Sequence, residues 1–199
     1  MLVVVGLGNP GPQYAASRHN LGFVVVEELA RRWRLPLGPP RDGVRTTQGL
    51  VAGTATELVE PQMYMNLSGA ALSRLSRVID PRALVVVHDD LDLPPGCVRV
   101  KQDGGTAGHR GLESIVASYG SDFTRIRVGI GHPARGVDVA EFVLTPFEPS
   151  ESEAIQQAVE RAADAVECIL REGVPAAMRS FNVRAKSSPA ATAEPMGRK

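Results

Sequence analysis

The chain has 199 residues, of which 43% are hydrophobic and 22% charged, a composition typical of one or at most two globular domains. Its 22 basic and 22 acidic residues cancel, and a net charge of zero argues against a protein that coats nucleic acid through bulk charge. Two cysteines are too few for a disulfide framework, and no apolar run suits a signal peptide or a membrane span, so we expect a cytoplasmic protein with no membrane association.

Apolar strands alternate with helical patterns through the first half of the chain. Residues 2–5 are a continuous apolar run closed by Gly6, which indicates a buried strand, and residues 21–33 carry apolar side chains at helical spacing. The next elements expected are strands at 44–52 and 56–59 around a turn at Gly53, a helix at 68–78 capped by Asn66 or Ser68, and an apolar strand at 84–87.

The same alternation continues through the second half. The elements expected there are strands at 98–101 and 125–130, a glycine-rich loop at 103–108, and helices at 111–118, 150–171 and 175–181. This order predicts a single-domain α/β fold, with a largely parallel or mixed sheet flanked by helices on both faces. Residues 185–199 are rich in Ala, Ser and Pro, and we expect them to form a disordered tail.

Charge is uneven along the chain although it sums to zero. Residues 97–136 hold six basic and three acidic side chains, whereas residues 141–172 hold two basic and eight acidic ones. The first stretch is a candidate anion-binding face and the second a solvated helix, with ordinary surface charge as the alternative for both.

Residues 6–11 (GLGNPG) match the G-x-G-x-x-G pattern of dinucleotide-binding loops. That motif needs a helix to begin within the glycines, but here Pro10 and Pro12 lead into a polar stretch. We therefore expect no nucleotide at this loop. It instead presents polar side chains beyond the carboxyl end of the first strand, the edge at which open α/β sheets bind ligands, and His19 is among them.

A second polar loop follows the strand at 84–87. Asp89, Asp90 and Asp92 could bind a divalent metal through their oxygens, or one aspartate could orient a histidine of the neighbouring loop. A solvated acidic turn is the third interpretation.

Two further segments carry polar groups next to predicted helices. Asn66 is either a helix cap or a donor for an oxyanion or an attacking water. Residues 104–111 are either a flexible loop that lets a bulky ligand approach closely or a loop that only connects to the next helix. Histidine, aspartate, asparagine and tyrosine on such loops suit general-base activation of water without a metal.

Five long segments resemble bacterial peptidyl-tRNA hydrolases in order and spacing. The resemblance covers about residues 1–184, which we take as the catalytic domain. The segments are 6–23 (GLGNPGPQYAASRHNLGF), 63–69 (MYMNLSG), 88–96 (HDDLDLPPG), 104–112 (GGTAGHRGL) and 125–133 (RIRVGIGHP).

The resemblance implies a monomer with a mixed, twisted sheet that hydrolyses the ester between a peptide and tRNA. It implies that His19 is the catalytic base and that Asp89 holds and polarises it. It also implies that Asn9 and Asn66 position the peptide and the attacking water or oxyanion. No cofactor and no metal are expected.

By the same resemblance, other residues bind the substrate. Tyr14, Tyr64, Met65 and His109 resemble residues lining the site for the peptide and the terminal nucleotides. Arg99, Lys101 and Arg127 fall on positions that the family uses for the tRNA backbone.

The chain departs from the family pattern after the glycine loop. Arg110 stands where many members have Asn, and Thr106-Ala107 replaces a His-Gly pair. A guanidinium cannot accept a hydrogen bond, so we expect Arg110 to contact a phosphate or a peptide carbonyl.

Two other functions remain open at this point. One is a non-catalytic RNA-binding protein on the same scaffold, against which the presence of His19 and Asp89 argues. The other is a metal-dependent phosphohydrolase that uses Asp89, Asp90 and Asp92, which activity sensitive to EDTA would favour.

Overall fold

The computed structural model describes residues 1–75 and 77–182. These residues form one sheet of six strands in the order β2-β3-β1-β4-β6-β5, with β1, β3, β4 and β6 parallel and the edge strands β2 and β5 antiparallel to their neighbours. The strands are β1 (Leu2–Gly6), β2 (Val44–Val51), β3 (Thr54–Pro61), β4 (Leu84–Asp90), β5 (Val98–Gln102) and β6 (Thr124–Gly129).

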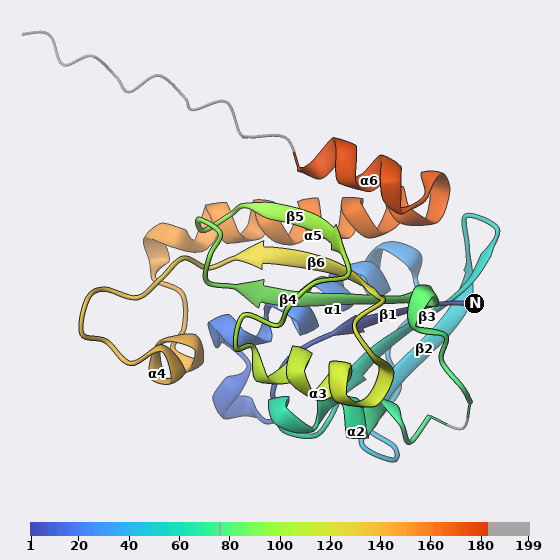
Figure 1. Cartoon of the computed structure of the whole chain (residues 1–199), viewed down its shortest axis with the longest axis horizontal. Coiled ribbons are helices and arrows are strands. Elements are labelled where there is room, and N and C mark those ends of the chain that lie inside the picture. Colours follow the sequence, from blue (N-terminus) through green and yellow to red (C-terminus); the bar gives the residue numbers. More distant parts are fainter. Residues whose placement is uncertain (76, 183–199) are drawn as a thin grey trace, which may run out of the picture.

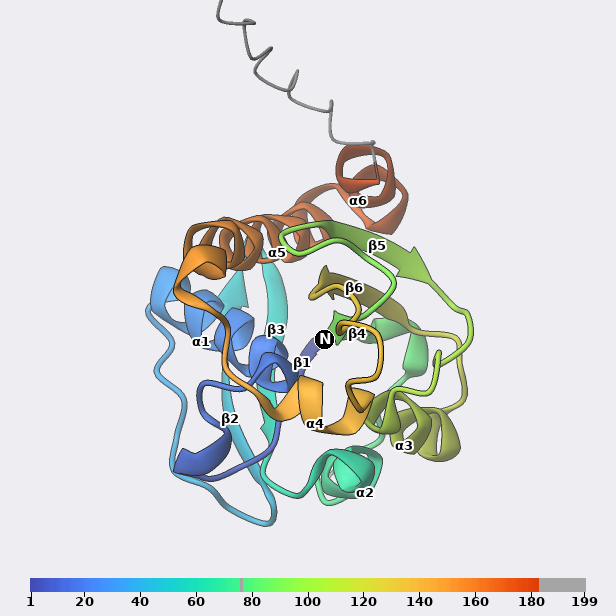
Figure 2. The same ribbon diagram turned by 90° about the vertical axis from the view of Figure 1, so that its left-hand side faces the viewer.

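Helices cover both faces of this sheet (Figure 1). The helices α1, α5 and α6 pack on one face, and α2 and α3 on the other, while α4 lies beyond the carboxyl ends of the parallel strands. Figure 2 looks onto that edge, with α4 in front of the sheet. The helices are α1 (Leu21–Trp33), α2 (Ser68–Leu72), α3 (Arg110–Tyr119), α4 (Val139–Leu144), α5 (Ser152–Glu172) and α6 (Val174–Phe181).

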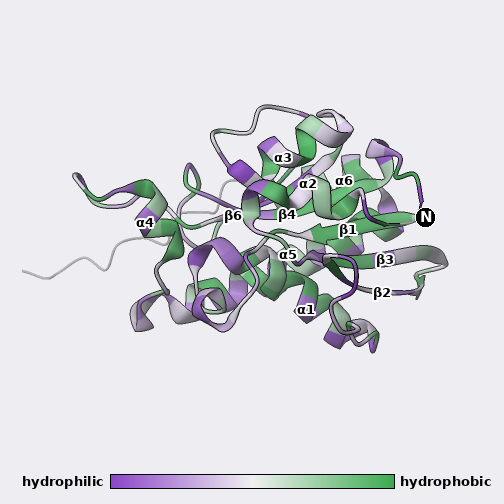
Figure 3. Ribbon diagram, turned by 90° about the horizontal axis from the view of Figure 1, so that it is seen from below, coloured by the Kyte–Doolittle hydropathy of each residue, from purple (hydrophilic) through white to green (hydrophobic). Residues whose placement is uncertain are grey.

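The apolar runs form strands because both faces of the sheet are buried. In β1, Val4 packs into the core under α1 and α5, while Val3 and Val5 pack into the core under α2 and α3. Figure 3 shows hydrophobic colour along the central strands β1 and β4, and a mixture of hydrophobic and hydrophilic residues on the surrounding helices. The α/β class and the covering of both faces are therefore confirmed.

Close backbone approach sets where α1 begins. A Cβ atom on Gly22 would lie only 2.5 Å from the carbonyl oxygens of Leu7 and Val87, so the first turn of α1 can reach the ends of β1 and β4 only because residue 22 has no side chain. This contact brings the 3-10 turn Arg18–Asn20, which precedes α1, to the carboxyl edge of the sheet.

Two features of the sequence analysis are confirmed here. The backbone at residues 52 and 53 has positive φ angles of 47° and 78°, which joins β2 and β3 by the turn expected at Gly53. The glycine motif at residues 6–11 is followed by two 3-10 turns, and the first α-helix begins at Leu21, so the motif does not lead directly into the helix that a dinucleotide loop requires.

Two expectations about element boundaries are wrong, and one helix was missed. The strand expected at 84–87 continues to Asp90, because His88 and Asp89 pair with β6 instead of forming a loop. The helix expected at 68–78 ends at Leu72, because the N–H groups of Arg74 and Leu75 donate to carbonyls three residues back and so form turns in place of α-helical bonds. Helix α4 was not anticipated.

The cap expected for α2 is also wrong. Leu67 occupies the cap position and no side chain caps the helix; the Ser68 hydroxyl donates to the Met65 carbonyl instead. The tail expected at 185–199 lies outside the described residues, so the division into a domain at 1–184 and a tail stays a prediction. Of the helices within 1–75 and 77–182, none is long and apolar enough to cross a membrane.

The contact at Gly22 predicts a large loss of stability on adding one methyl group. We expect Gly22→Ala to lower the free energy of unfolding by about 3 kcal/mol, because the neighbouring atoms are backbone and cannot rotate away. Gly105→Ala is the matched control, since its Cβ would meet open space and its effect should stay within about 0.5 kcal/mol. Urea denaturation of both variants measures the difference, and equal stabilities would contradict the account of this contact.

Candidate active site

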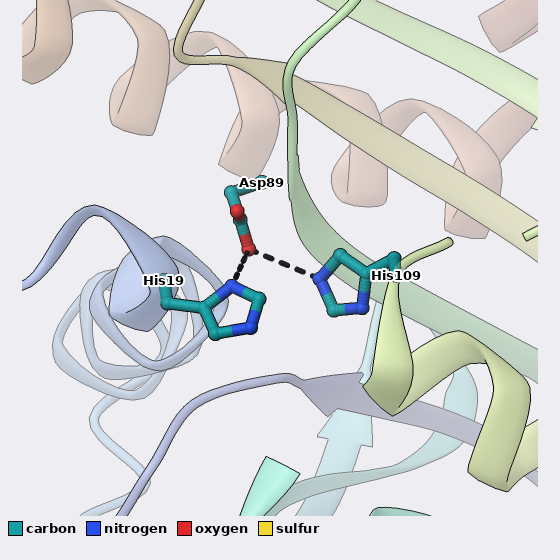
Figure 4. Close-up of side chains that lie close together, drawn as sticks. All are labelled: His19, Asp89 and His109. Atoms are coloured by element: carbon teal, nitrogen blue, oxygen red, sulfur yellow. Dashed lines mark hydrogen bonds and ion pairs between the residues drawn. The ribbon is translucent and has the colours of Figure 1, made fainter. Parts of the chain in front are cut away.

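Three side chains from distant segments meet at the carboxyl end of β4 (Figure 4). Asp89 lies at the end of the strand, and one of its oxygens, Oδ1, is 2.8 Å from His19 Nδ1 and 3.1 Å from His109 Nε2. The two imidazole rings are 4.8 Å apart between centroids. Sequence analysis paired Asp89 with His19, and the structure adds His109 as a second partner of the same oxygen.

Burial and charge act in opposite directions on Asp89. Burial of the carboxyl, which is 3% exposed, by itself raises its pKa. Positive charge on either imidazole when it is protonated, together with the hydrogen bonds from both rings, outweighs burial and holds the pKa of Asp89 well below its usual range. The carboxylate is therefore ionised and accepts from both rings.

The N-terminus of α3 determines which nitrogen of His109 carries the proton. Backbone N–H groups of Gly111 and Leu112 donate to His109 Nδ1 at 3.1 and 3.3 Å, so Nδ1 is an acceptor. The proton of the neutral ring consequently lies on Nε2 and is donated to Asp89. His109 is thus a helix cap and a donor to the carboxylate at once.

The same reasoning assigns the proton on His19. Because ionised Asp89 only accepts, His19 Nδ1 donates to it, which leaves Nε2 of the neutral ring with a free lone pair. The His19 side chain is 12% exposed, and the ring lines a cleft. A neutral imidazole with a free Nε2 can accept a proton from water.

His88 lies beside this cluster but has a different environment. Its Nδ1 donates to the backbone carbonyl of Asp89 at 2.7 Å, and its ring meets that of His109 edge-on at 5.1 Å. Burial lowers the pKa of His88, so this ring stays neutral.

Asn9 is held by its neighbours so that its amide can donate. Its backbone N–H and C=O pair with the side chain of Asn20 at 2.9 and 3.0 Å, and its Oδ1 accepts from Met65 N at 2.8 Å. With Oδ1 engaged, the Nδ2 group is the part of Asn9 left for a ligand.

These groups line one cleft of about 900 Å³. Helix α4 forms one wall with Val139, Val143 and Leu144. The other predicted site residues of the cleft come from the loops after β1 and β3 and from the start of α3. The cleft contains Asn9, Tyr14, His19, Tyr64, Met65, Asn66, Asp89, His109 and Arg110.

The three predicted tRNA-backbone residues lie outside the lining of the cleft, on β5 and β6. Arg99 and Arg127 are cross-strand neighbours, and Lys101 is exposed two residues further along the same face. Arg127 Nε donates to Asp90 at 2.6 Å, and Arg99 donates to the carbonyl of Phe181 at 3.0 Å. Because Asp90 lines the cleft, Arg127 links this basic face to its rim.

The three aspartates considered as metal ligands have separate partners. Asp90 pairs with Arg127, Asp92 lies 3.1 Å from His132, and Asp89 contacts the two histidines. Among residues 1–75 and 77–182, the His19–Asp89–His109 cluster is the group whose ligand atoms lie close together, within 4.8 Å. A metal there would require both rings to give up their hydrogen bonds to Asp89, so this donor set is a poor fit for one.

Comparison with known proteins shows the family of this chain. The family model for peptidyl-tRNA hydrolase matches residues 3–190. This chain belongs to the peptidyl-tRNA hydrolase family. The peptidyl-tRNA hydrolase of Chloroflexus aurantiacus is 46% identical over 186 residues, which are 92% of this chain and 99% of the relative, and that of Moorella thermoacetica is 45% identical over 92% and 98%.

The fold is shared with solved members of the family. The crystal structure of peptidyl-tRNA hydrolase from Acinetobacter baumannii is similar to this chain with a TM-score of 0.85 and 38% identity, over 92% of this chain and 94% of that one. The protein is accordingly an enzyme of the peptidyl-tRNA hydrolase family, with the mixed α/β sheet that the sequence resemblance implied.

Sequence reasoning missed the wall formed by α4. A signal was available, because Asp138 and Glu141 have the spacing of a helix start with an acidic third residue. The structure has this cap, with the Asp138 carboxylate accepting from the N–H groups of Ala140 and Glu141 at 2.6 and 3.1 Å. No comparable local signal marks His109 as a partner of Asp89, since the two are 20 residues apart.

The depressed pKa of Asp89 predicts a dependence of stability on pH. Its pKa in the folded state lies below the unfolded value of about 3.9, so its contribution is complete above about pH 4 and is lost as the pH falls further. We expect Asp89→Asn to be less stable than wild type by about 1–3 kcal/mol at pH 7, with the difference shrinking below pH 4. Denaturant melts across this range measure it, and equal stability at pH 7 would contradict net stabilisation of the carboxylate.

Proposed function

We propose that this protein hydrolyses the ester bond between the peptide and the tRNA of peptidyl-tRNA, with His19 as general base. The observation that carries the proposal is the bond between His19 Nδ1 and ionised Asp89, because it leaves the Nε2 lone pair available at the cleft. Membership of the peptidyl-tRNA hydrolase family supports the choice of substrate.

The proton transfers follow from this arrangement. His19 Nε2 removes a proton from a water molecule as its oxygen attacks the ester carbonyl, and Asp89 stabilises the imidazolium that forms. The imidazolium then gives its proton to the oxygen of the departing ribose, which restores the neutral ring. His109 holds the carboxylate in place during both transfers through its bond to the same oxygen.

Amide groups are suited to stabilise the charge on the carbonyl oxygen. Asn9 has its Nδ2 free of the contacts that engage its Oδ1, and Asn66 is exposed on the cleft. A donor aimed at a developing oxyanion supplies on the order of 10² to 10³ in rate. We assign these two amides to the oxyanion and the peptide.

Substrate binding divides between the cleft and the basic face. Tyr14, Tyr64 and Met65 line the cleft, where the peptide and the terminal nucleotides lie in this proposal. Arg99, Lys101 and Arg127 contact phosphates of the tRNA. Since phosphate contacts release counterions, we expect affinity for tRNA to fall as salt rises.

Removal of the base tests the mechanism. We expect His19→Ala to lower kcat by about 10² to 10⁴-fold while the Kd for tRNA stays close to that of wild type, because binding depends on other residues. Release of peptide from an N-blocked aminoacyl-tRNA, measured with and without EDTA, gives turnover, and filter binding gives affinity.

Other outcomes of this assay have distinct meanings. Wild-type protein that binds tRNA without cleaving it would be an RNA-binding protein on the same scaffold. Activity abolished by EDTA would point to a metal-dependent hydrolase instead. A loss of affinity equal to the loss of turnover would make His19 a substrate contact.

Arg110 offers a test of how the terminal nucleotides are held. Its guanidinium is exposed, lines the cleft and stands at the start of α3, so we assign it to a phosphate of the 3′ end of tRNA. Arg110→Asn should raise the KM for peptidyl-tRNA about 10-fold, with a smaller effect on kcat. Lys101→Ala is the comparison variant, expected to weaken binding and reduce the salt dependence by about one phosphate contact. Unchanged KM and kcat in Arg110→Asn would refute its role.

A further inference from the structure

Arg18, the residue before the proposed base, is buried away from the cleft. Its guanidinium carbon lies 4.5 Å from the ring centre of Phe142 and 4.6 Å from that of Phe147. Its two terminal nitrogens donate to the two carboxylate oxygens of Glu151 at 2.8 and 2.6 Å. Arg18 is 4% exposed, so a charged side chain is enclosed by two rings and a carboxylate.

Glu151 is itself held in place. Besides the two bonds from Arg18, its Oε2 accepts from the backbone N–H of Glu148 at 2.8 Å, at the turn that enters α5. The hydrogen bonds from Arg18 lower the pKa of Glu151, so the carboxylate is ionised at neutral pH. The guanidinium therefore joins the turn that carries His19 to the start of α5.

Backbone contacts reinforce this connection beside α4. Arg18 N–H donates to the carbonyl of Thr145 at 3.0 Å, and Ser17 forms an isolated bridge with Pro146. Phe142, one of the two rings on Arg18, belongs to α4, whose neighbouring residues Val143 and Leu144 line the cleft. One buried arginine thus contacts the wall of the cleft and is adjacent in sequence to the base.

We propose that Arg18 is a positioning residue that fixes His19 relative to the α4 wall of the substrate cleft. The inference rests on the proposed function, because it concerns the same base. Arg18 acts through the turn Arg18–Asn20: with its guanidinium fixed between Phe142, Phe147 and Glu151, the backbone of the turn holds the His19 ring at hydrogen-bonding distance from Asp89. It touches no reacting atom.

The chemistry of arginine suits this task better than that of lysine. A planar guanidinium can lie between two rings and bind a carboxylate through two parallel hydrogen bonds. An ammonium is a compact point charge and has no such pair of coplanar donors. Misplacement of a catalytic group by about 1 Å costs on the order of 10²-fold in rate, so a looser turn would lower kcat even though every catalytic side chain is present.

The test compares three variants with wild type. Arg18→Gln removes both the positive charge and the pair of parallel hydrogen bonds to Glu151. Arg18→Lys keeps the positive charge but cannot form that pair of bonds. Arg45→Gln is the matched control, because Arg45 also binds a buried carboxylate, that of Glu60 at 2.9 Å, but on β2 and β3 and outside the cleft lining. All are assayed at a temperature at which each is folded by circular dichroism.

Two measurements separate positioning from a merely structural role. The first is kcat and KM for N-blocked aminoacyl-tRNA, together with the Kd for uncharged tRNA. The second is the proton NMR signal of His19 Nδ1–H, which lies downfield when it is bonded to a carboxylate and needs no substrate. It is assigned by its loss in His19→Ala.

We expect Arg18→Gln to lower kcat by about 10- to 100-fold, with Kd for tRNA unchanged and the His19 signal shifted or broadened. Arg18→Lys should recover part of the rate, and Arg45→Gln should alter neither kcat nor the signal. If Arg18→Gln fails to fold, Glu151→Gln serves in its place, because it keeps the two rings and one acceptor oxygen.

Other results overturn the inference. Wild-type kcat and an unchanged His19 signal in a folded Arg18→Gln or Glu151→Gln variant would show that the arginine does not position the base. An equal loss of kcat in Arg45→Gln would reduce its role to general stability. Absence of turnover in wild type would refute the proposed function, while the NMR comparison would still decide whether Arg18 positions His19.

Discussion

The buried carboxylate of Asp89 is the group on which the arrangement of the site depends. An ionised carboxylate that is nearly inaccessible to water requires donors, and the protein supplies two imidazole N–H groups to one oxygen. Each donor is delivered by a different element: His19 by the turn before α1, and His109 by the cap of α3. The hydrogen bonds to the Asp89 carboxylate therefore hold β4, the turn before α1 and the start of α3 together at the edge of the sheet.

The two histidines that bond to Asp89 differ in what their other ring nitrogen contacts. His109 Nδ1 is occupied by backbone N–H groups of α3, so this ring cannot serve as a base without losing its role as a cap. His19 has no such restriction in the described contacts and lines the cleft. Identical side chains bonded to the same oxygen are therefore suited to unlike tasks, one to anchor the carboxylate and the other to accept a proton.

Charge in this protein is organised locally, with a net charge of zero over the whole chain. Basic residues of β5 and β6 lie on one face, and Arg127 connects that face to the cleft through Asp90. Arg125, buried on β6 over the ring of Phe123, donates to the carbonyl of Gly104 and so holds the glycine-rich loop that leads to the cleft. Arginines here act both as binding groups and as structural supports, and their surroundings decide which.

The sequence by itself determined the alternation of strands and helices, the strand run of residues 2–5 and the family resemblance, since these depend on local patterns of apolar and polar residues. It also marked His19, Asp89 and Asn9 as site residues. Only the tertiary structure decided that Asp89 lies within a strand, that His109 shares it with His19, and that Arg18 is enclosed by Phe142, Phe147 and Glu151. The physical reason is that burial and hydrogen-bond partners come from residues far apart in sequence: His19 and Asp89 are 70 positions apart and Arg18 and Glu151 are 133 apart, and no local pattern encodes such pairs.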